Sequence, residues 1–144
     1  MSDVSPLVRR VRAAESAVAR FNGQPFVWGK ADCVRLVAHV LRELGATPPL
    51  REAGEYKTLL GAKRALKRTG QATLDAWVDS WGLPRIPPAL ALPGDIVALP
   101  GVYGDMPALT VSLSNGRLIG FVGEVGAVMA LRDPTAPLAA WSVV

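Results

Sequence analysis

The hydrophobic positions in the first half of the chain recur at the spacing of amphipathic helices. Ser5 and Pro6 are typical of a helix start, because serine caps free N–H groups and proline is accepted in the first turn. Gly23 ends this run. We expect the buried face of the helix to carry its larger apolar residues, Val8, Val11, Val18 and Phe21.

A second helix is predicted after Asp32, whose carboxylate can cap it, and a glycine ends it. Its apolar stripe comprises Leu36, Val37, Val40, Leu41 and Leu44. Cys33, the only cysteine, then lies at the first helical position. Residues 23–32 have turn residues at both ends, so we expect an extended loop in which Phe26 and Trp28 are buried.

Two further helices are predicted before the chain changes character. A basic helix covers about residues 58–69, and a shorter one carries Leu74, Trp77 and Trp81 before a closing glycine. The proline-rich segment "LPRIPPALALPG" follows at residues 83–94 and ends the helical part of the chain.

From residue 94 onward, short β-rich runs alternate with turn residues. The predicted strands cover residues 95–99, 108–113, 117–122, 127–131 and 140–144. Asn115 and Gly116 both accept the positive φ of a type I′ turn, which predicts a hairpin. Helices followed by antiparallel strands indicate an α+β fold in which the cysteine helix lies across the sheet.

The length predicts a single domain over residues 1–144, mainly helical over 1–82 and mainly stranded over 94–144. Half of the residues are hydrophobic, but no run approaches the roughly 20 apolar residues of a membrane helix, so no membrane insertion is expected. The N-terminal segment also lacks the apolar run of a signal peptide, which predicts synthesis in the host cytoplasm.

Net charge is +4, and the clearest basic cluster comprises Lys57, Lys63, Arg64, Lys67 and Arg68. A solvated helix face is the favoured interpretation of this cluster, and contact with an acidic partner is the alternative. No nucleic-acid partner is predicted. One cysteine and one histidine provide neither an internal disulfide nor a tetrahedral zinc site, so no metal or other cofactor is expected.

Cys33 has two interpretations on the residues alone. A helix N-terminus favours the thiolate, but a cysteine hydrolase also needs a histidine to move protons. The only candidate, His39, lies about 240° around the same helix and about 9 Å along it, too far for a hydrogen bond to Cys33. Arg35 and Arg42 place His39 on a polar, surface or partner-facing side. A small buried residue is therefore favoured over a reactive thiol.

The four tryptophans, Trp28, Trp77, Trp81 and Trp141, have two interpretations as well. Tryptophan lines sugar-binding grooves as well as cores, and core packing is favoured for each. Trp28 is expected to lie close to Cys33 and to cover it.

The segment "GQPFVWGKADCVRLVAHVL" resembles the nucleophile region of NlpC/P60-type cysteine peptidases, with its "F/Y-x-W-G-x-x-D-C-x-x-L/F-V/A" pattern. Downstream, "PGDIVAL" is similar to the glycine-aspartate strand of that family, and "ALTVSLSNGRLIGF" to its histidine strand and hairpin. Within the family, "GEYKTLLGAKRALKRTG" and "LPRIPPALALPGD" resemble a phage- and prophage-associated branch of unknown function. The resemblance spans nearly the whole chain and implies a papain-like α+β fold.

One position departs from the pattern of the active enzymes. Their motif "H-V-G-I/V-Y-x-G-N/D-G" supplies the catalytic base, and aligning its Asn-Gly with Asn115 and Gly116 puts Ala108 at the histidine. General acid–base action is worth about 10² to 10⁴ in rate, and triad members act as a unit. The resemblance thus implies that Cys33 is a vestigial or unusual nucleophile.

Trp28, Asp32 and Asp95 are expected to line this site. The resemblance makes Asp95 a fold position, and we expect it to cap a turn or to accept hydrogen bonds from backbone N–H groups.

Two functions follow from the resemblance. The favoured one is a component of a phage or prophage tail tip or baseplate, located in the virion tail, whose inactive domain binds other tail proteins. The alternative is a peptidoglycan peptidase or amidase that aids genome entry, with Cys33 as nucleophile and a base such as Asp32, Asp95 or a group from a partner.

Overall fold

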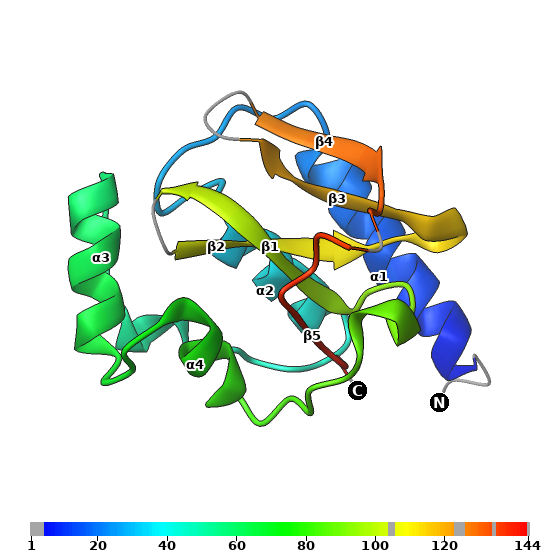
Figure 1. Cartoon of the computed structure of the whole chain (residues 1–144), viewed down its shortest axis with the longest axis horizontal. Helices are drawn as coiled ribbons and strands as arrows, with labels where there is room; N and C mark the ends of the chain where they lie inside the picture. The colour runs from blue at the N-terminus through cyan, green and yellow to red at the C-terminus, as the bar shows by residue number, and fades with distance from the viewer. Residues whose placement is uncertain (1–4, 104–105, 123–125, 134, 144) are drawn as a thin grey trace.

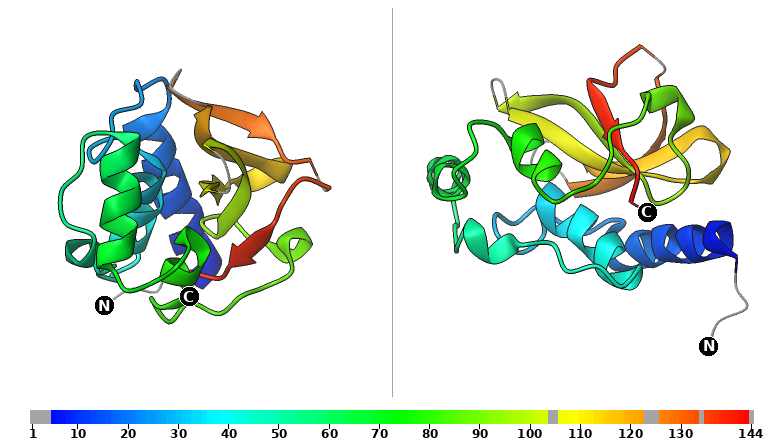
Figure 2. Two further views of the ribbon diagram at one scale, coloured as in Figure 1. Left: turned by 60° about the vertical axis from the view of Figure 1, so that its left-hand side comes forward. Right: turned by 90° about the horizontal axis from the view of Figure 1, so that it is seen from below.

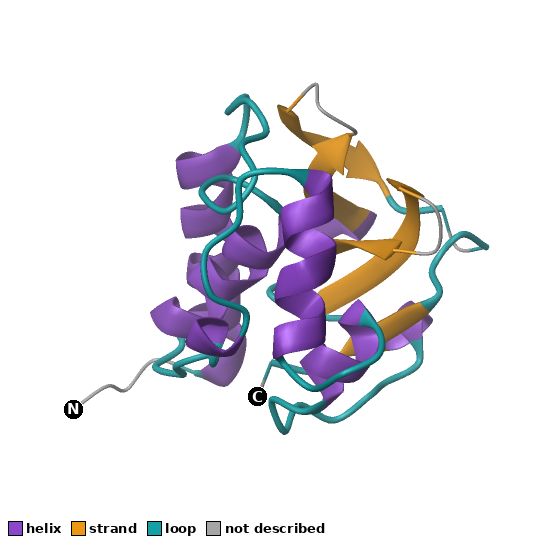
Figure 3. Ribbon diagram, turned by 90° about the vertical axis from the view of Figure 1, so that its left-hand side faces the viewer, coloured by secondary structure: helices purple, strands orange, loops and turns teal. Residues whose placement is uncertain are grey.

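The computed structural model describes residues 5–103, 106–122, 126–133 and 135–143 of the chain. The fold is α+β, as predicted, with helices packed on a five-stranded antiparallel sheet (Figure 1). Figure 2 shows the two longest helices beneath one face of the sheet, and Figure 3 shows the helices gathered on one side and the strands on the other.

The helices begin and end close to the predicted residues. They are α1 (Pro6–Phe21), α2 (Cys33–Glu43), α3 (Leu59–Arg68) and α4 (Leu74–Asp79), with three short 3₁₀ turns at Leu50–Glu52, Pro88–Leu90 and Ser114–Gly116. The two predicted caps are confirmed: Ser5 Oγ accepts from the N–H of Val8 over 3.3 Å, and Asp32 Oδ1 accepts from the N–H of Arg35 over 2.9 Å.

The buried face of α1 differs from the prediction. Val8 is 42% exposed and Val11 and Val18 are only half-buried, so of the four predicted residues only Phe21 is buried. The residues that α1 buries are mostly small: Arg10, Ala13, Ala14, Ala17 and Phe21. Alanines allow α1 to approach its neighbour α2 closely, and this close contact selected the alanine face over the valine face.

The sheet has the strand order β4-β3-β2-β1-β5, with every neighbouring pair antiparallel. The strands are β1 (Ile96–Tyr103), β2 (Met106–Ser112), β3 (Arg117–Val122), β4 (Gly126–Leu131) and β5 (Ala139–Trp141). The turn between β2 and β3 is confirmed, since Asn115 has φ of 63° and Gly116 has φ of 70°. Because β4 and β5 lie at opposite edges, the segment joining them crosses the sheet on the face away from α1 and α2 (Figure 1).

The main core lies between α2 and the sheet. Four of the five residues of the predicted α2 stripe are buried, and Leu44 is half-buried. They pack with Ile96, Leu109, Val111 and Ile119 from the three central strands. The helix that carries Cys33 therefore lies across the sheet, as expected (Figure 1).

The tryptophans of the second half of the chain pack in or against the core, as predicted. Trp77 and Trp141 are buried, and each indole N–H donates to a carboxylate, from Trp77 to Glu52 over 3.0 Å and from Trp141 to Asp79 over 2.7 Å. Trp81 is half-buried and packs against the core, with its ring centroid 5.2 Å from that of Trp77. It was expected on the same helix as Trp77, but α4 ends before it.

A buried ionic cluster joins the two ends of the chain. Asp95 is 1% exposed, and its carboxylate accepts from the N–H groups of Leu92 and Val143 over 2.9 and 3.0 Å. The expected backbone hydrogen bonds of Asp95 are thus present. Its second role was not predicted: Arg10, also buried, donates to the same carboxylate over 2.5 Å and to Ser142 Oγ over 3.1 Å.

Candidate functional site

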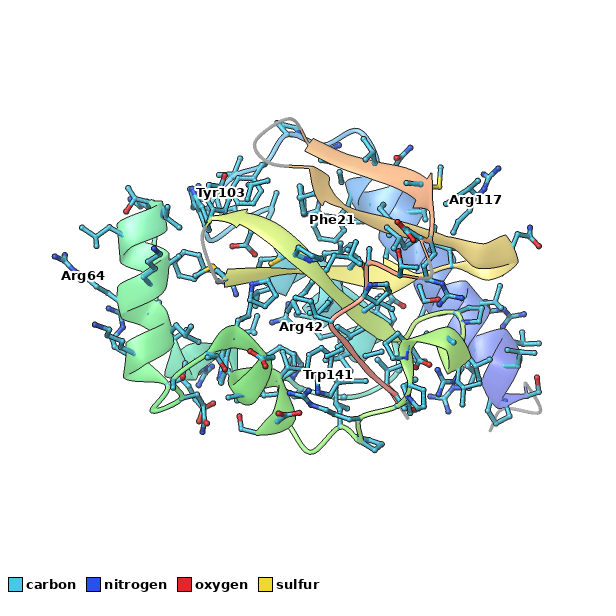
Figure 4. All side chains as sticks on the ribbon, in the orientation of Figure 1. Phe21, Arg42, Arg64, Tyr103, Arg117 and Trp141 are labelled. Atoms are coloured by element: carbon cyan, nitrogen blue, oxygen red, sulfur yellow. The ribbon has the colours of Figure 1, made fainter. Side chains whose placement is uncertain are left out.

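A cavity of about 350 Å³ lies beside the N-terminus of α2. Its walls come from α2, α3, α4, strands β1 to β4 and the segment that follows β4. Aromatic rings form one side of it: the centroid of Trp28 lies 4.7 Å from Phe26, 6.5 Å from Tyr56 and 5.3 Å from Tyr103. In Figure 4, Tyr103 lies at the end of β1 nearest α3.

Phe26 and Trp28 were predicted to be buried, and this is wrong. Both are half-buried, because they line the open cavity and are not enclosed in the core. Trp28 and Cys33 line the same cavity, in keeping with the expected proximity of the two residues.

Asp32 stabilises the N-terminus of α2 and the loop that precedes it. One oxygen, Oδ1, accepts from the N–H of Arg35, while Oδ2 accepts from the N–H of Gly29 over 2.8 Å and from the hydroxyl of Tyr56 over 2.7 Å. Gly29 has a φ of +76°, and a Cβ there would lie 2.3 Å from the carbonyl oxygen of Tyr56. Both oxygens of Asp32 are therefore engaged in supporting the loop, the helix and Tyr56.

The thiol of Cys33 is not activated by its position. Cys33 is half-buried, so the burial favoured from the sequence is only partly right. Desolvation, followed by the nearby charge of Asp32, raises the pKa of Cys33 from its ordinary 9.0 to about 12. Hydrogen bonds from the backbone N–H groups of Leu109, Cys33 and Val34 lower the pKa, but by less. The expected effect of the helix N-terminus is thus present and is outweighed by desolvation.

Ala108 lies on β2 opposite Leu99 of β1 and lines the same cavity as Cys33. The backbone N–H of Leu109, the residue next to Ala108, is one of those that lower the pKa of Cys33. Leu109 packs in the core against α2, so the side chain of Ala108 points to the opposite face of β2. The position where the resemblance expects a histidine has no side chain able to carry a proton.

His39 lies outside this cavity. Its Nε2 is 2.8 Å from Ser16 Oγ and 3.7 Å from the carboxylate of Glu43, and its ring meets Phe21 edge-on at 5.7 Å. Burial lowers its pKa. The predicted surface position is therefore only partly right: His39 is half-buried between α1 and α2.

Asp95 was expected to line the site, and the structure corrects this. It is absent from the walls of the cavity and is bonded to Arg10 in the buried ionic cluster. Of the two carboxylates considered as an unusual base, only Asp32 lies beside Cys33.

The basic cluster on and near α3 is exposed to solvent, as Arg64 illustrates in Figure 4. Arg68 differs from the other members, because it donates to the backbone carbonyls of Ala53 and Glu55 over 2.9 and 3.1 Å. Within the described ranges, His, Cys, Asp and Glu side chains form no group of three or more that could hold a metal ion. No described helix is long and apolar enough to span a membrane.

The sequence was also compared with known proteins. The family model of DUF6950, described as a domain of unknown function, matches residues 8–143. The chain belongs to this family. No curated protein and no solved structure matches the chain. The DUF6950 domain thus covers both the helices and the sheet, and with them every wall of the cavity.

Tyr56 lines the DUF6950 cavity, but nothing in the sequence marked it as a candidate site residue. It lies in an irregular segment between α2 and α3, and only the structure shows that its hydroxyl donates to Asp32. Burial and the charge of Asp32 raise the pKa of Tyr56, which keeps the hydroxyl protonated as a donor.

Replacing Tyr56 by phenylalanine is expected to lower the free energy of unfolding by about 1.5–3 kcal/mol, the usual value of a hydrogen bond to a charged group. Urea unfolding followed by tryptophan fluorescence measures this loss. Thr135→Val removes an exposed hydrogen bond to Asp133 and is the control, with little expected effect. An unchanged midpoint for Tyr56→Phe would show that the Tyr56 hydroxyl does not support Asp32.

Proposed function

We propose that this protein is a catalytically inactive module with a papain-like, NlpC/P60-type fold that serves in the tail tip or baseplate of a phage or prophage. The observation that carries the proposal is that the cavity beside a protonated Cys33 has Ala108, and no histidine, among its lining residues. The tail location comes from the resemblance of the sequence to the phage-associated branch of that family.

Two features of the fold support the papain-like assignment. A cysteine begins a helix that crosses an antiparallel sheet, and the strand next to it carries the position equivalent to the catalytic histidine. The carboxylate that precedes the cysteine caps the helix and fixes the tryptophan-containing loop through Gly29. The motif residues thus stabilise the fold, and this role does not depend on catalysis.

Hydrolysis of an amide by a thiol needs a thiolate nucleophile and a base, and this cavity provides neither. The nucleophile must be a thiolate, yet the raised pKa keeps Cys33 protonated near neutral pH. A base must take and return a proton, yet Ala108 has none to offer. Asp32, the nearest carboxylate, already accepts three hydrogen bonds. We therefore assign the cavity to binding, with its aromatic wall as the contact surface.

One observation favours the alternative, a peptidoglycan peptidase or amidase. The backbone N–H groups of Leu109, Cys33 and Val34 lower the pKa of the Cys33 thiol. Backbone donors near a thiol favour the thiolate, which is the nucleophile that such an enzyme needs. A base supplied by a partner protein would be needed to complete that mechanism.

Zymography on purified cell wall tests the proposal. The wild type, Cys33→Ala and Ala108→His are compared at equal concentration, and the expected result is no clearing by the wild type or by Cys33→Ala. Clearing by the wild type that is lost in Cys33→Ala would contradict the assignment of an inactive module. Ala108→His reports whether the missing base alone prevents the reaction.

The tail location requires a separate measurement. Mass spectrometry of purified virions or induced prophage particles is expected to detect the chain in the tail fraction. Its presence only in the lysate, with tails complete and infectious in its absence, would contradict the location.

A further inference from the structure

β4 lies at one edge of the sheet, and its outer side is only partly covered (Figure 1). Ala127 exchanges backbone hydrogen bonds with the segment that follows α1. The N–H of Gly23 donates to the carbonyl of Ala127 over 2.9 Å, and the N–H of Ala127 donates to the carbonyl of Gln24 over 3.1 Å. Ala127 therefore points its backbone groups away from β3.

The pairing between β3 and β4 determines which other residues of β4 point their backbone groups away from β3. In an antiparallel pair, successive residues direct their N–H and C=O groups alternately toward and away from the neighbouring strand. Met129 and Leu131 therefore point outward like Ala127, while Val128 and Ala130 bond to β3. Among the described residues, no backbone group outside the ladder bonds to Met129 or Leu131. Four backbone polar groups thus lie along a free edge.

The side chains of this edge are apolar. Val128 is 38% exposed, Met129 is 41% exposed and Leu131 is 75% exposed, and Ala130 between them is exposed too. Edge strands of monomeric proteins are usually protected by charged residues, proline or a bulge. Residues 127–131 contain no charge and no proline, and their pairing with β3 is regular. This edge has the properties of a surface that accepts another strand.

We propose that the occupant is a second copy of this chain, added antiparallel to β4 about a two-fold axis at Ala130. In this register Met129 of each copy faces Leu131 of the other. All four of these residues point their backbone groups outward, so they form four hydrogen bonds across the axis. Residues whose backbone groups point away from β3 alternate symmetrically on either side of Ala130. Two copies of this edge can therefore pair with each other about a two-fold axis.

A groove next to β4 supports this register. Met129 lines a depression of about 260 Å³ together with Val11, Ala14 and Val18 of α1 and Leu113, and its remaining walls are polar, from Glu15, Ser114, Asn115 and Arg117. Neighbouring side chains across an antiparallel pair lie on the same face of the sheet. Leu131 of the second copy therefore lies beside Met129 and reaches this groove, which removes the most exposed side chain of β4 from water.

Segment 22–24 limits the size of the interface. It already occupies Ala127, so pairing between the copies cannot extend beyond Val128 at that end. A short interface of this kind gives a weak dimer that forms at high protein concentration.

Sedimentation velocity over a concentration series tests the proposal. The wild type is expected to change from monomer to dimer as its concentration rises, and Leu131→Lys to raise the dissociation constant by about tenfold or more. Leu60→Lys, which changes a 58% exposed leucine on α3, is the matched control and should dimerise like the wild type. A wild type that stays monomeric, or a dimer that Leu131→Lys leaves unchanged, would overturn the proposal.

Cross-linking tests the register independently. In a Cys33→Ala background, Ala130→Cys places two cysteines opposite each other at the two-fold axis, at a non-hydrogen-bonded pair. Such pairs have Cα atoms about 4.5 Å apart, within the roughly 4.4–6.8 Å span of disulfides. Mild oxidation is expected to cross-link this variant. Val128→Cys is the control, since residue 128 faces Arg132 of the other copy and should not cross-link; equal cross-linking of both variants would exclude this register.

Discussion

Replacing Asp95 by alanine is expected to lower the free energy of unfolding by about 3–5 kcal/mol, because removal of one partner leaves a buried charge unpaired. Arg10 and Asp95 have side chains that are 9% and 2% exposed, so water cannot take the place of the lost carboxylate. The N–H groups of Leu92 and Val143 lose their acceptor at the same time. Since whole domains are stable by only about 5–15 kcal/mol, the variant should unfold at much lower urea concentration.

Two further variants separate the buried charge from general damage. Asp75→Ala breaks an exposed pair with Arg85, and a loss of about 1 kcal/mol or less is expected. Adding Arg10→Met to Asp95→Ala removes the stranded guanidinium and should restore part of the stability. If the double variant is no more stable than Asp95→Ala, the cost does not come from the unpaired charge.

Cys33 is expected to react with iodoacetamide about thirty- to sixtyfold more slowly near neutral pH than the same cysteine in an unfolded peptide. Raising the pKa from 9.0 to about 12 lowers the thiolate fraction about a thousandfold. A more basic thiolate is also more nucleophilic, which recovers roughly sixteen- to thirtyfold of that loss. The alkylation rate of Cys33 should keep rising with pH well beyond the range in which the alkylation rate of the peptide levels off. Alkylation quenched at a series of times and analysed by mass spectrometry measures both rates.

The same shift predicts how stability depends on pH. The folded protein keeps the Cys33 proton to a higher pH than the unfolded chain does, so the stabilising effect is complete below about pH 9. It is lost as the pH rises from about 9 toward 12, when only the unfolded thiol ionises. Rapid stoichiometric alkylation near pH 6 would contradict both expectations and would indicate an activated nucleophile.

Local signals in the sequence were sufficient for the elements of the fold. Ser5 and Asp32 cap helices because their side chains accept from backbone N–H groups three residues later, and this depends only on neighbours in the chain. Asn115 and Gly116 determine a turn for a similarly local reason. The buried face of α2 could be predicted because its large apolar residues repeat at helical spacing on a single face.

Features that depend on contacts between distant residues could not be predicted from the sequence. The valine stripe of α1 was as regular as the alanine face, and only the approach of α2 decided between them. Arg10 and Asp95 lie 85 positions apart, so no pattern in the sequence joins them. Burial of Phe26 and Trp28 was overestimated, because hydrophobicity alone does not distinguish a cavity wall from a core.

The candidate site divides in the same way. Cys33 and Ala108 were selected from motif positions, and the structure places both at one cavity. The direction of the Cys33 pKa shift was not predictable, because it results from the competition between nearby N–H groups and desolvation. Tyr56 was missed, since a tyrosine in an irregular segment carries no chemical signal until its partner is known.

The bond between Arg10 and Ser142 has a consequence for how this fold forms during synthesis. Arg10 leaves the ribosome 85 residues before Asp95 and 132 residues before Ser142. β5 likewise pairs with β1 only after both strands have been made. The charge of Arg10 therefore stays unpaired until these later segments emerge, and contacts between such distant residues favour slow folding.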